Sequence, residues 1–294
     1  MGSEKTKVSL VLGSGGARGL AHIGVIRWLE KNNFEIISIS GCSIGSLIGG
    51  VYAAGKLDKL ETWMRAISKT DILSLLDVSW GSSGIFKGEK IINTLINILG
   101  DTQIEDLPVP FTAVASDIVA GKEVWINSGS LFNAIRASIS LPLFFTPFNY
   151  NGTKLIDGGV LNPVPIAPTF NDDSDLIIAV SLGGEVVNSN SSSKQVFKKT
   201  EKSISFQQSF KKFLQPFQKE NSKVKSENLG MYDVADKAFD AMQSTIARQK
   251  IAAYPPDILV EIARNACGTL EFNRAAEMIT LGYNTAQTAF DKTK

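Results

Sequence analysis

The chain has 294 residues, of which 44% are hydrophobic and 20% are charged, a composition typical of soluble globular proteins. Its formal net charge of +1 argues against a dedicated nucleic-acid-binding protein, which usually carries a strong basic excess, so we expect no nucleic-acid partner. Two cysteines are too few for a disulfide framework, and the single histidine leaves one candidate for any mechanism that needs an imidazole.

The first predicted unit is a strand, a glycine-rich turn and a helix. The chain starts without the apolar core of a secretory signal. Residues 8–12, VSLVL, predict a buried strand, and GSGGARG at 13–19 predicts the turn. Apolar residues at helical spacing then predict a helix over 20–32. It carries His22, which we interpret as a packed or hydrogen-bonded residue near the core, with a catalytic role as the alternative.

The second unit repeats this order, with a strand over 35–40, the turn GCSIGS at 41–46 and a helix over 47–56. Its uncharged window 36–55 repeats the G-x-x-x-G spacing of packed transmembrane helices. Five glycines and four serines nevertheless make this window a poor bilayer span, so we expect no transmembrane helix and a cytoplasmic protein. Two strand–turn–helix units predict an α/β fold whose mainly parallel central sheet has helices on both faces.

The later segments extend this pattern. Residues 110–129 predict two strands joined by a turn at Gly121-Lys122, and residues 175–184 predict a strongly apolar, central strand. Residues 229–294 are mostly helical in pattern. We therefore predict a single domain over 5–294, with 185–228 as an insertion or flexible segment and 229–294 as a C-terminal helical part.

The insertion differs in composition from the rest of the chain. Between 194 and 225 it contains nine lysines and two glutamates. Four phenylalanines at steps of four, three and four predict one stripe of a helix: Phe206, Phe210, Phe213 and Phe217. Two interpretations stay open, an interfacial helix that gives the 194–225 segment a peripheral contact with anionic lipid, and a surface helix packed on the core.

Ser43 is the candidate nucleophile. It lies in G-x-S-x-G between Gly41 and Gly45, after a predicted strand and before a predicted helix, which is the context of a nucleophile elbow. The tight turn exposes the hydroxyl, and the flanking positions must be tiny because strand and helix otherwise collide. A glycine-rich helix start with an accidental serine is the alternative. Cys42, beside it, is interpreted as a small packing residue.

An elbow requires an oxyanion hole and a base. The amides of GSGGARG could hold an oxyanion, whereas Arg18 stands where the dinucleotide fingerprint requires glycine and no G-K-[ST] follows for a P-loop. With one histidine in the chain, a carboxylate is the expected base. Asp157, which ends an apolar run ahead of two glycines, is the best-placed candidate, with turn capping as its alternative role. Asp117 is a second candidate, which we interpret as structural.

Three short motifs occur together in the chain: GGARG at 15–19, GCSIG at 41–45 and DGG at 157–159. In this combination the sequence resembles the patatin-like phospholipase family over 8–184, including RASISLPLFFTP at 136–147, and faintly again near PPDILVEI. The resemblance implies a three-layer α/β fold and a Ser–Asp dyad carried by Ser43 and Asp157. The family's other site positions fall on the oxyanion loop Gly15, Gly16, Ala17 and Arg18, on the elbow glycines Gly41 and Gly45, and on Gly158 and Gly159 of the DGG motif.

The resemblance implies a serine hydrolase that cleaves carboxylic esters of phospholipids or lysophospholipids through an acyl-enzyme. The scheme requires no metal and no cofactor. A soluble carboxylesterase or thioesterase, or a non-enzymatic regulatory protein on the same fold, is the alternative. Arg18 would either orient the loop or meet a lipid phosphate. The sequence gives no indication of the oligomeric state.

Overall fold

The computed structural model describes residues 5–77, 84–187 and 231–292. Contacts divide the chain into one compact unit of residues 1–186 with 238–294, and a second unit of residues 187–237. The expectations for 185–228, among them the phenylalanine stripe and a membrane contact through 194–225, lie outside the described residues except at 185–187.

The larger unit is built on an eight-stranded sheet with the order β10-β9-β1-β2-β4-β8-β7, in which β5 also pairs with β4. Its parallel strands are β1 (Thr6–Leu12), β2 (Phe34–Cys42), β4 (Phe111–Asp117), β9 (Leu176–Gly184) and β10 (Ile258–Ala263). The antiparallel strands are β5 (Lys122–Ile126), β7 (Phe148–Tyr150) and β8 (Thr153–Asp157). A separate pair is formed by β3 (Gly84–Phe86) and β6 (Leu143–Phe145). The prediction of a mainly parallel sheet is confirmed.

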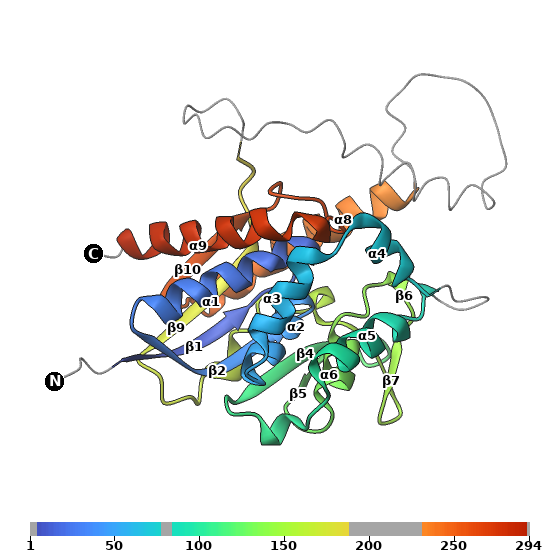
Figure 1. Ribbon diagram of the computed structural model, residues 1–294, viewed down its shortest axis with the longest axis horizontal. Helices are drawn as coiled ribbons and strands as arrows, with labels where there is room; N and C mark the ends of the chain where they lie inside the picture. The colour runs from blue at the N-terminus through green and yellow to red at the C-terminus, as the bar shows by residue number, and fades with distance from the viewer. Residues whose placement is uncertain (1–4, 78–83, 188–230, 293–294) are drawn as a thin grey trace. The chain divides into compact units, whose positions relative to one another are not determined.

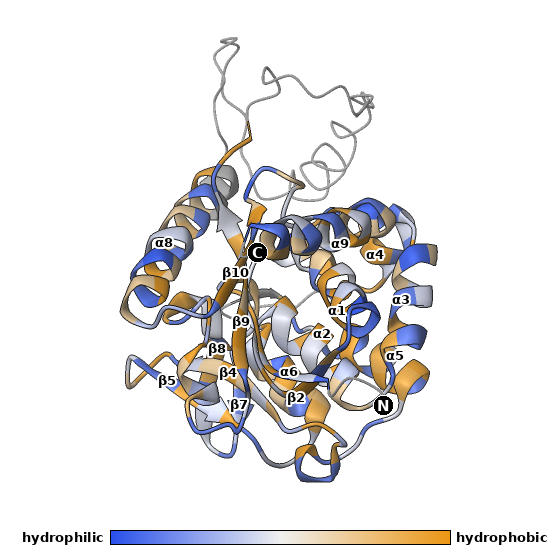
Figure 2. Cartoon of the chain, turned by 90° about the vertical axis from the view of Figure 1, so that its left-hand side faces the viewer, coloured by the Kyte–Doolittle hydropathy of each residue, from blue (hydrophilic) through white to orange (hydrophobic). Residues whose placement is uncertain are grey.

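Helices cover both faces of this sheet, as Figures 1 and 2 show: α1, α2 and α9 lie on one side and α8 on the other. The described helices are α1 (Ala21–Lys31), α2 (Ile44–Ala53), α3 (Leu57–Ala66), α4 (Lys69–Ser74), α5 (Glu89–Leu99), α6 (Leu131–Ser138), α8 (Met231–Ala253) and α9 (Ala275–Asp291). Alternating side chains of β1 explain the layers, because neighbours on a strand point to opposite faces. Leu10 and Leu12 enter the larger core, whereas Val11 packs in a smaller core with Ala247 of α8.

Helices α1 and α9 cross at very short range because both carry glycine at the contact. A Cβ atom at Gly24 would lie 1.9 Å from the carbonyl oxygen of Ile279, and one at Gly282 would lie 1.9 Å from that of Ala21. Side chains at either position would therefore separate the helices. This close contact holds the C-terminal helix against the first strand–turn–helix unit.

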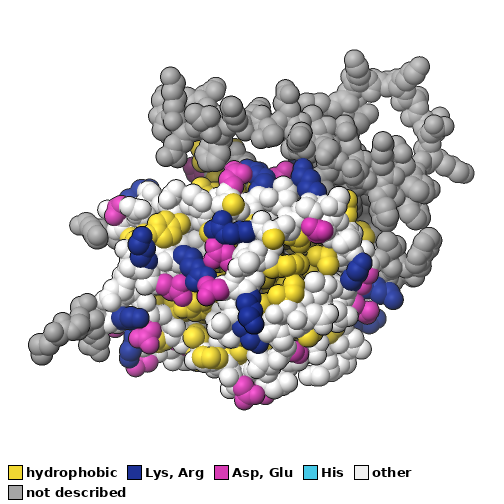
Figure 3. All heavy atoms as spheres, viewed as in Figure 1, with side chains coloured by type: hydrophobic (Ala, Val, Ile, Leu, Met, Phe, Trp, Pro, Cys, Tyr) yellow, Lys and Arg dark blue, Asp and Glu magenta, His cyan; other side chains and the backbone are white. Residues whose placement is uncertain are grey.

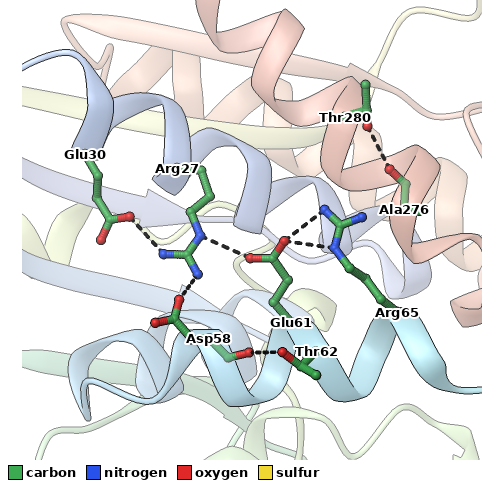
Figure 4. A network of polar contacts seen from close by, with 8 residues as sticks. All are labelled: Arg27, Glu30, Asp58, Glu61, Thr62, Arg65, Ala276 and Thr280. Atoms are coloured by element: carbon green, nitrogen blue, oxygen red, sulfur yellow. Dashed lines mark hydrogen bonds and ion pairs between the residues drawn. The ribbon is translucent and has the colours of Figure 1, made fainter.

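Charged side chains link α1 and α3 at the surface. Arg27 of α1 contacts Glu30 on its own helix and Asp58 and Glu61 of α3, and Glu61 also contacts Arg65 (Figure 4). Such exposed pairs contribute modestly to stability. Basic and acidic side chains are interspersed across the face seen in Figure 3, with apolar side chains between them. Among the described residues, no helix combines the length and apolar character needed to cross a bilayer.

The elements differ from the sequence-based prediction in several places. The strand predicted at 35–40 continues through Cys42, and the helix predicted at 47–56 begins at Ile44, so the turn between them contains a single residue. The C-terminal part, predicted to be mostly helical, also contributes β10, which extends the parallel sheet beside β9. β10 is only six residues long and directly follows the YPPD segment, and the strand beside it, β9, lies some 80 residues earlier in the sequence.

Candidate active site

Ser43 occupies the turn between β2 and α2. Its backbone has φ 55° and ψ −124°, in the positive-φ region that non-glycine residues rarely adopt and that marks strained functional turns. The Ser43 carbonyl accepts the amides of Ser46 and Leu47, so α2 starts directly at the serine. The helix N-terminus therefore places its positive end beside the hydroxyl, which is partly exposed.

The sheet register brings Asp157 to Ser43. Cys42, at the end of β2, pairs with Val114 of β4, and Asp157, at the end of β8, pairs with the next residue, Ala115. β8 thus continues along β4 where β2 stops, and the two strand ends meet. The Ser43 hydroxyl donates a hydrogen bond to Oδ2 of Asp157 at 2.5 Å. The structure therefore places the two predicted dyad residues together.

The environment of Asp157 suits a proton acceptor. The side chain is 1% exposed, and burial raises its pKa from 3.8 to about 7, against hydrogen bonds from Ser43 and Gly159 that lower it. The Gly159 amide donates to Oδ1 at 2.7 Å, which leaves Oδ2 for the serine. A carboxylate with this pKa can take a proton from a neighbouring hydroxyl near neutral pH.

The end of α6 supports both residues, a role that motif reasoning did not assign. The Ser43 amide donates to Oγ of Ser138 at 2.9 Å, and that hydroxyl donates to the Val114 carbonyl at 2.6 Å. Two residues later the carbonyl of Ser140 accepts the Asp157 amide at 2.9 Å. The RASIS stretch at 136–140, part of the family resemblance described above, is the feature of the sequence that could have indicated this role. It holds the backbones of the two dyad residues in place.

Four glycines of the motifs lie where any Cβ would meet another backbone or side chain. At Gly45 it would lie 2.0 Å from the Leu12 carbonyl, and at Gly41 it would lie 2.5 Å from the Gly45 carbonyl. At Gly158 it would lie 2.1 Å from the Val114 carbonyl, and at Gly159 it would meet Ser14 of the glycine-rich turn and Gln243 of α8. These close approaches pack the elbow and the DGG turn against the ends of β1 and β4.

The glycine-rich turn offers fewer amides than the sequence suggested. The amide of Ala17 donates to the Thr269 carbonyl at 2.9 Å, so it is already engaged within the protein. Gly15 and Gly16, which precede it, carry no side chains that could shield their N–H groups. We therefore narrow the expected donors from residues 15–18 to these two glycines. The Ala17 amide has a protein acceptor, and the Arg18 amide is the third position of the 3-10 helix Gly16–Leu20, whose first backbone bond goes to the Gly15 carbonyl.

Arg18 and His22 act on this turn from inside the protein. Arg18 is 5% exposed and donates through Nε to the Gly15 carbonyl at 3.0 Å, so its geometry matches loop orientation. His22 is fully buried, and Nε2 lies 2.8 Å from the Gly13 carbonyl, to which it donates. Burial lowers the pKa of His22 to about 4, which keeps the ring neutral at pH 7. The interpretation of His22 as a hydrogen-bonded core residue is confirmed.

The other two candidates have structural positions. Cys42 is completely buried, and burial raises the pKa of its thiol well above the ordinary value, which suits packing and not nucleophilic attack. Asp117 accepts the amides of Val119 and Ala120 through Oδ1 and so caps the β4–β5 turn. Among the described residues, no group of three or more His, Cys, Asp and Glu side chains gathers as a metal site.

Comparison with known proteins gives consistent matches. A family model described as Patatin-like phospholipase matches residues 10–170. An uncharacterized NTE family protein of Mycobacterium tuberculosis is 36% identical over 334 residues, covering 99% of this chain and 93% of the relative. The neuropathy target esterase sws of Drosophila melanogaster is 32% identical over 185 residues, which cover 60% of this chain and 13% of that protein. A lysophospholipase of Cryptococcus neoformans var. neoformans is 34% identical over 182 residues, covering 60% and 11%.

Proposed function

Because the chain belongs to the patatin-like phospholipase family, whose members include lipid acyl hydrolases, we propose that it hydrolyses carboxylic esters of phospholipids or lysophospholipids through a Ser43–Asp157 dyad. The observation that carries the proposal is the 2.5 Å hydrogen bond from the Ser43 hydroxyl to Asp157 at a strained elbow. The lysophospholipase relative supports the substrate class. Other described serines also donate to aspartates, Ser9 and Ser38 to Asp172 and Ser130 to Asp101, but of these serines Ser43 alone has a positive φ.

The first half of the reaction forms an acyl-enzyme. Asp157 Oδ2 takes the proton of Ser43 as Oγ attacks the ester carbonyl, and the carbonyl becomes a tetrahedral oxyanion. The amides of Gly15 and Gly16 stabilise this charge, a contribution often worth about 3–4 kcal/mol for one donor. The C–O bond then breaks, and the proton on Asp157 passes to the departing alcohol, here a lysophospholipid or glycerophosphodiester.

The second half releases the fatty acid by the same steps. Asp157 takes a proton from water, and the resulting hydroxide attacks the acyl carbonyl on Ser43. The tetrahedral intermediate collapses, the proton returns from Asp157 to Ser43 Oγ, and the carboxylic acid leaves. One carboxylate thus serves as base and acid in turn, consistent with a pKa near the working pH.

A fluorophosphonate probe tests the assignment of the nucleophile and base. We expect stoichiometric labelling of Ser43, identified by peptide mass spectrometry, no labelling of Ser43→Ala, and labelling slowed by at least about 100-fold in Asp157→Asn. Hydrolysis of lysophospholipid micelles should fall in parallel. Full activity in Ser43→Ala would refute the assignment.

The same enzyme preparation distinguishes the soluble-ester alternative. A lipid acyl hydrolase should be more active on long-chain lysophospholipid above its micellar concentration than on the same concentration of a short-chain nitrophenyl ester. Preference for the short-chain ester, with the dyad still required, would instead support a soluble carboxylesterase. Absence of both activities and of fluorophosphonate labelling in the wild-type chain would favour the non-enzymatic alternative.

A further inference from the structure

The direction of the Gly16 amide depends on the carbonyl before it. Gly15 and Gly16 share a planar trans peptide, in which the Gly15 carbonyl and the Gly16 N–H point in opposite directions. Arg18 Nε donates to that carbonyl at 3.0 Å. The arginine therefore fixes the direction in which the Gly16 N–H points.

A restraint beyond the backbone bond matters for this peptide because it joins two glycines. Rotating the peptide changes ψ of Gly15 and φ of Gly16, and glycine tolerates both signs of φ. Gly15 has φ 160° and Gly16 has φ 58°, and the Ala17 amide beyond them is anchored on Thr269. Gly15 is the N-cap of the 3-10 helix Gly16–Leu20, so its carbonyl also accepts the first backbone bond of that helix. The Arg18 side chain is therefore the contact that ties this peptide to α8 in addition to its backbone bond.

Asp240 of α8 holds the arginine. Its Oδ1 accepts from Arg18 Nη2 at 2.6 Å, and the Arg264 carbonyl accepts from Nη1 at 2.7 Å. The Arg18 side chain is 6% exposed and that of Asp240 is 28% exposed, so the pair is mostly removed from solvent. A charge-assisted contact at this depth is stronger than a surface ion pair. The planar guanidinium uses each of its three nitrogens on a different acceptor.

A second contact from α8 reaches the same turn. Gln243, one helical turn after Asp240, donates through Nε2 to Ser14 Oγ at 3.0 Å. The side chains of Asp240, Gln243, Arg18 and Ser14 line one narrow cavity. The helix thus contacts the glycine-rich turn both before and after the Gly15–Gly16 peptide.

We propose that Asp240 is a positioning residue which, through Arg18, locks the Gly15–Gly16 peptide with the Gly16 N–H directed at the reacting ester oxygen. The inference rests on the proposed function and assigns to α8 a part in the oxyanion hole. Loss of the Asp240 carboxylate frees the arginine to swing, and the peptide then samples the flipped orientation, in which a carbonyl replaces the donor.

Steady-state kinetics per active site tests this role. In the full-length chain, fluorophosphonate titration gives the concentration of reactive Ser43, and kcat and KM are measured for Asp240→Asn and Asp240→Ala. We expect kcat per titrated site to fall about 10- to 100-fold, more in the alanine variant, because one oxyanion donor is worth about 100- to 1000-fold when removed outright. KM should stay within about twofold, since the ground-state ester gains little from that donor.

A matched control separates positioning from general docking of α8. Lys250→Gln breaks another ion pair of the same helix, that of Lys250 with Glu123 at 2.6 Å, without touching the glycine-rich turn. It should leave kcat per titrated site unchanged. Asp240→Glu, which keeps the carboxylate, should recover part of the activity lost in Asp240→Ala.

Two outcomes overturn the proposal. The first is a kcat per titrated site that matches the wild type in Asp240→Ala while only the titratable fraction falls, which is the signature of a structural role. The second is an altered pH midpoint of kcat/KM, which would place the effect on Asp157. Ser43→Ala separates failure of the proposed function from failure of this inference. If Ser43→Ala remains active, the proposed function fails. If Ser43→Ala is inactive and Asp240→Ala has wild-type activity per titrated site, only the role of Asp240 fails.

Discussion

Asp157 is almost completely buried and accepts a hydrogen bond from the Ser43 hydroxyl. Burial raises its pKa to about 7, so half of the molecules carry the proton near neutral pH. Only the ionised form can accept the Ser43 proton. We expect kcat/KM to rise about tenfold per pH unit below pH 7 and to level off above it.

A pH–rate profile on a soluble nitrophenyl ester checks this expectation, because such an ester does not itself titrate between pH 5 and 9. A midpoint near 4 would mean that solvent reaches the carboxylate during turnover. His22 would not give the same curve, since burial places its pKa at about 4 and its ring faces the Gly13 carbonyl.

Cys42 provides a residue-scale test of the serine mechanism. Its thiol is buried, has a raised pKa and lies next to Gly158, so alkylating reagents should react with it slowly in the folded protein. We expect iodoacetamide to leave activity unchanged over hours at pH 7.5 and to modify Cys42 after unfolding in urea. Rapid inactivation with alkylation at Cys42 would contradict its assignment as a packing residue.

At the scale of elements, the dyad depends on packing between the elbow and the end of β1. A Cβ at position 45 would lie 2.0 Å from the Leu12 carbonyl, a backbone atom that cannot move without shifting the strand. We expect Gly45→Ala to lower the melting temperature and to abolish fluorophosphonate labelling. The control is Gly268→Ala, where the nearest atoms lie at an ordinary 3.4 Å, and it should behave as the wild type.

The end of α6 gives a second test at this scale. Ser138→Ala removes the acceptor of the Ser43 amide and the donor to the Val114 carbonyl, leaving both groups buried without that partner. Such losses cost about 1–3 kcal/mol, and the elbow should also relax, with a lower kcat. Thr280→Ala deletes an exposed hydroxyl that bonds to the Ala276 carbonyl (Figure 4) and should change neither property. Equal urea midpoints for the two variants would show that Ser138 supports nothing.

For the whole molecule, sequence reasoning works where function requires a local pattern. The elbow around Ser43 is readable because its glycines, strand and helix lie within twenty residues. On residue chemistry Asp157 is the best placed of two carboxylate candidates, and the family resemblance implies the same residue. Its closeness to Ser43 comes from the pairing of β4 with both β2 and β8. Its catalytic role stays a prediction.

Contacts between distant segments leave no such pattern. Asp240 and Arg18 are 222 residues apart, and an aspartate on a helical stretch gives no indication of its partner. The Ala17 amide looked like a free donor until Thr269, far along the chain, proved to accept it. β10 was missed for the same reason, since a short segment of six mostly apolar residues is ambiguous between strand and helix until its neighbour in the sheet is known.

Two of the buried titratable groups at the catalytic edge, Asp157 and His22, have opposite effects on the pH dependence of stability. Asp157 binds its proton more tightly in the folded state, with a pKa of about 7 against 3.8, so its contribution to stability rises as pH falls from 7 to 3.8. His22 binds its proton less tightly, about 4 against 6.5, so its contribution falls as pH falls from 6.5 to 4. Between pH 4 and 6.5 these two slopes oppose each other.

Removing either group should therefore change how the free energy of unfolding depends on pH. Relative to the wild type, the free energy of unfolding of Asp157→Asn should fall by about 1.4 kcal/mol for each pH unit from 6.5 to 4, because the variant lacks the stability that the wild type gains as Asp157 takes up its proton. His22→Gln, which keeps a donor for the Gly13 carbonyl, should show the opposite slope. Urea unfolding at pH 4.5, 5.5 and 6.5 measures both differences, and the other titrating groups cancel in the comparison. Three parallel profiles would mean that folding shifts the pKa of neither group. That outcome would contradict the elevated pKa of Asp157 that the proposed mechanism requires.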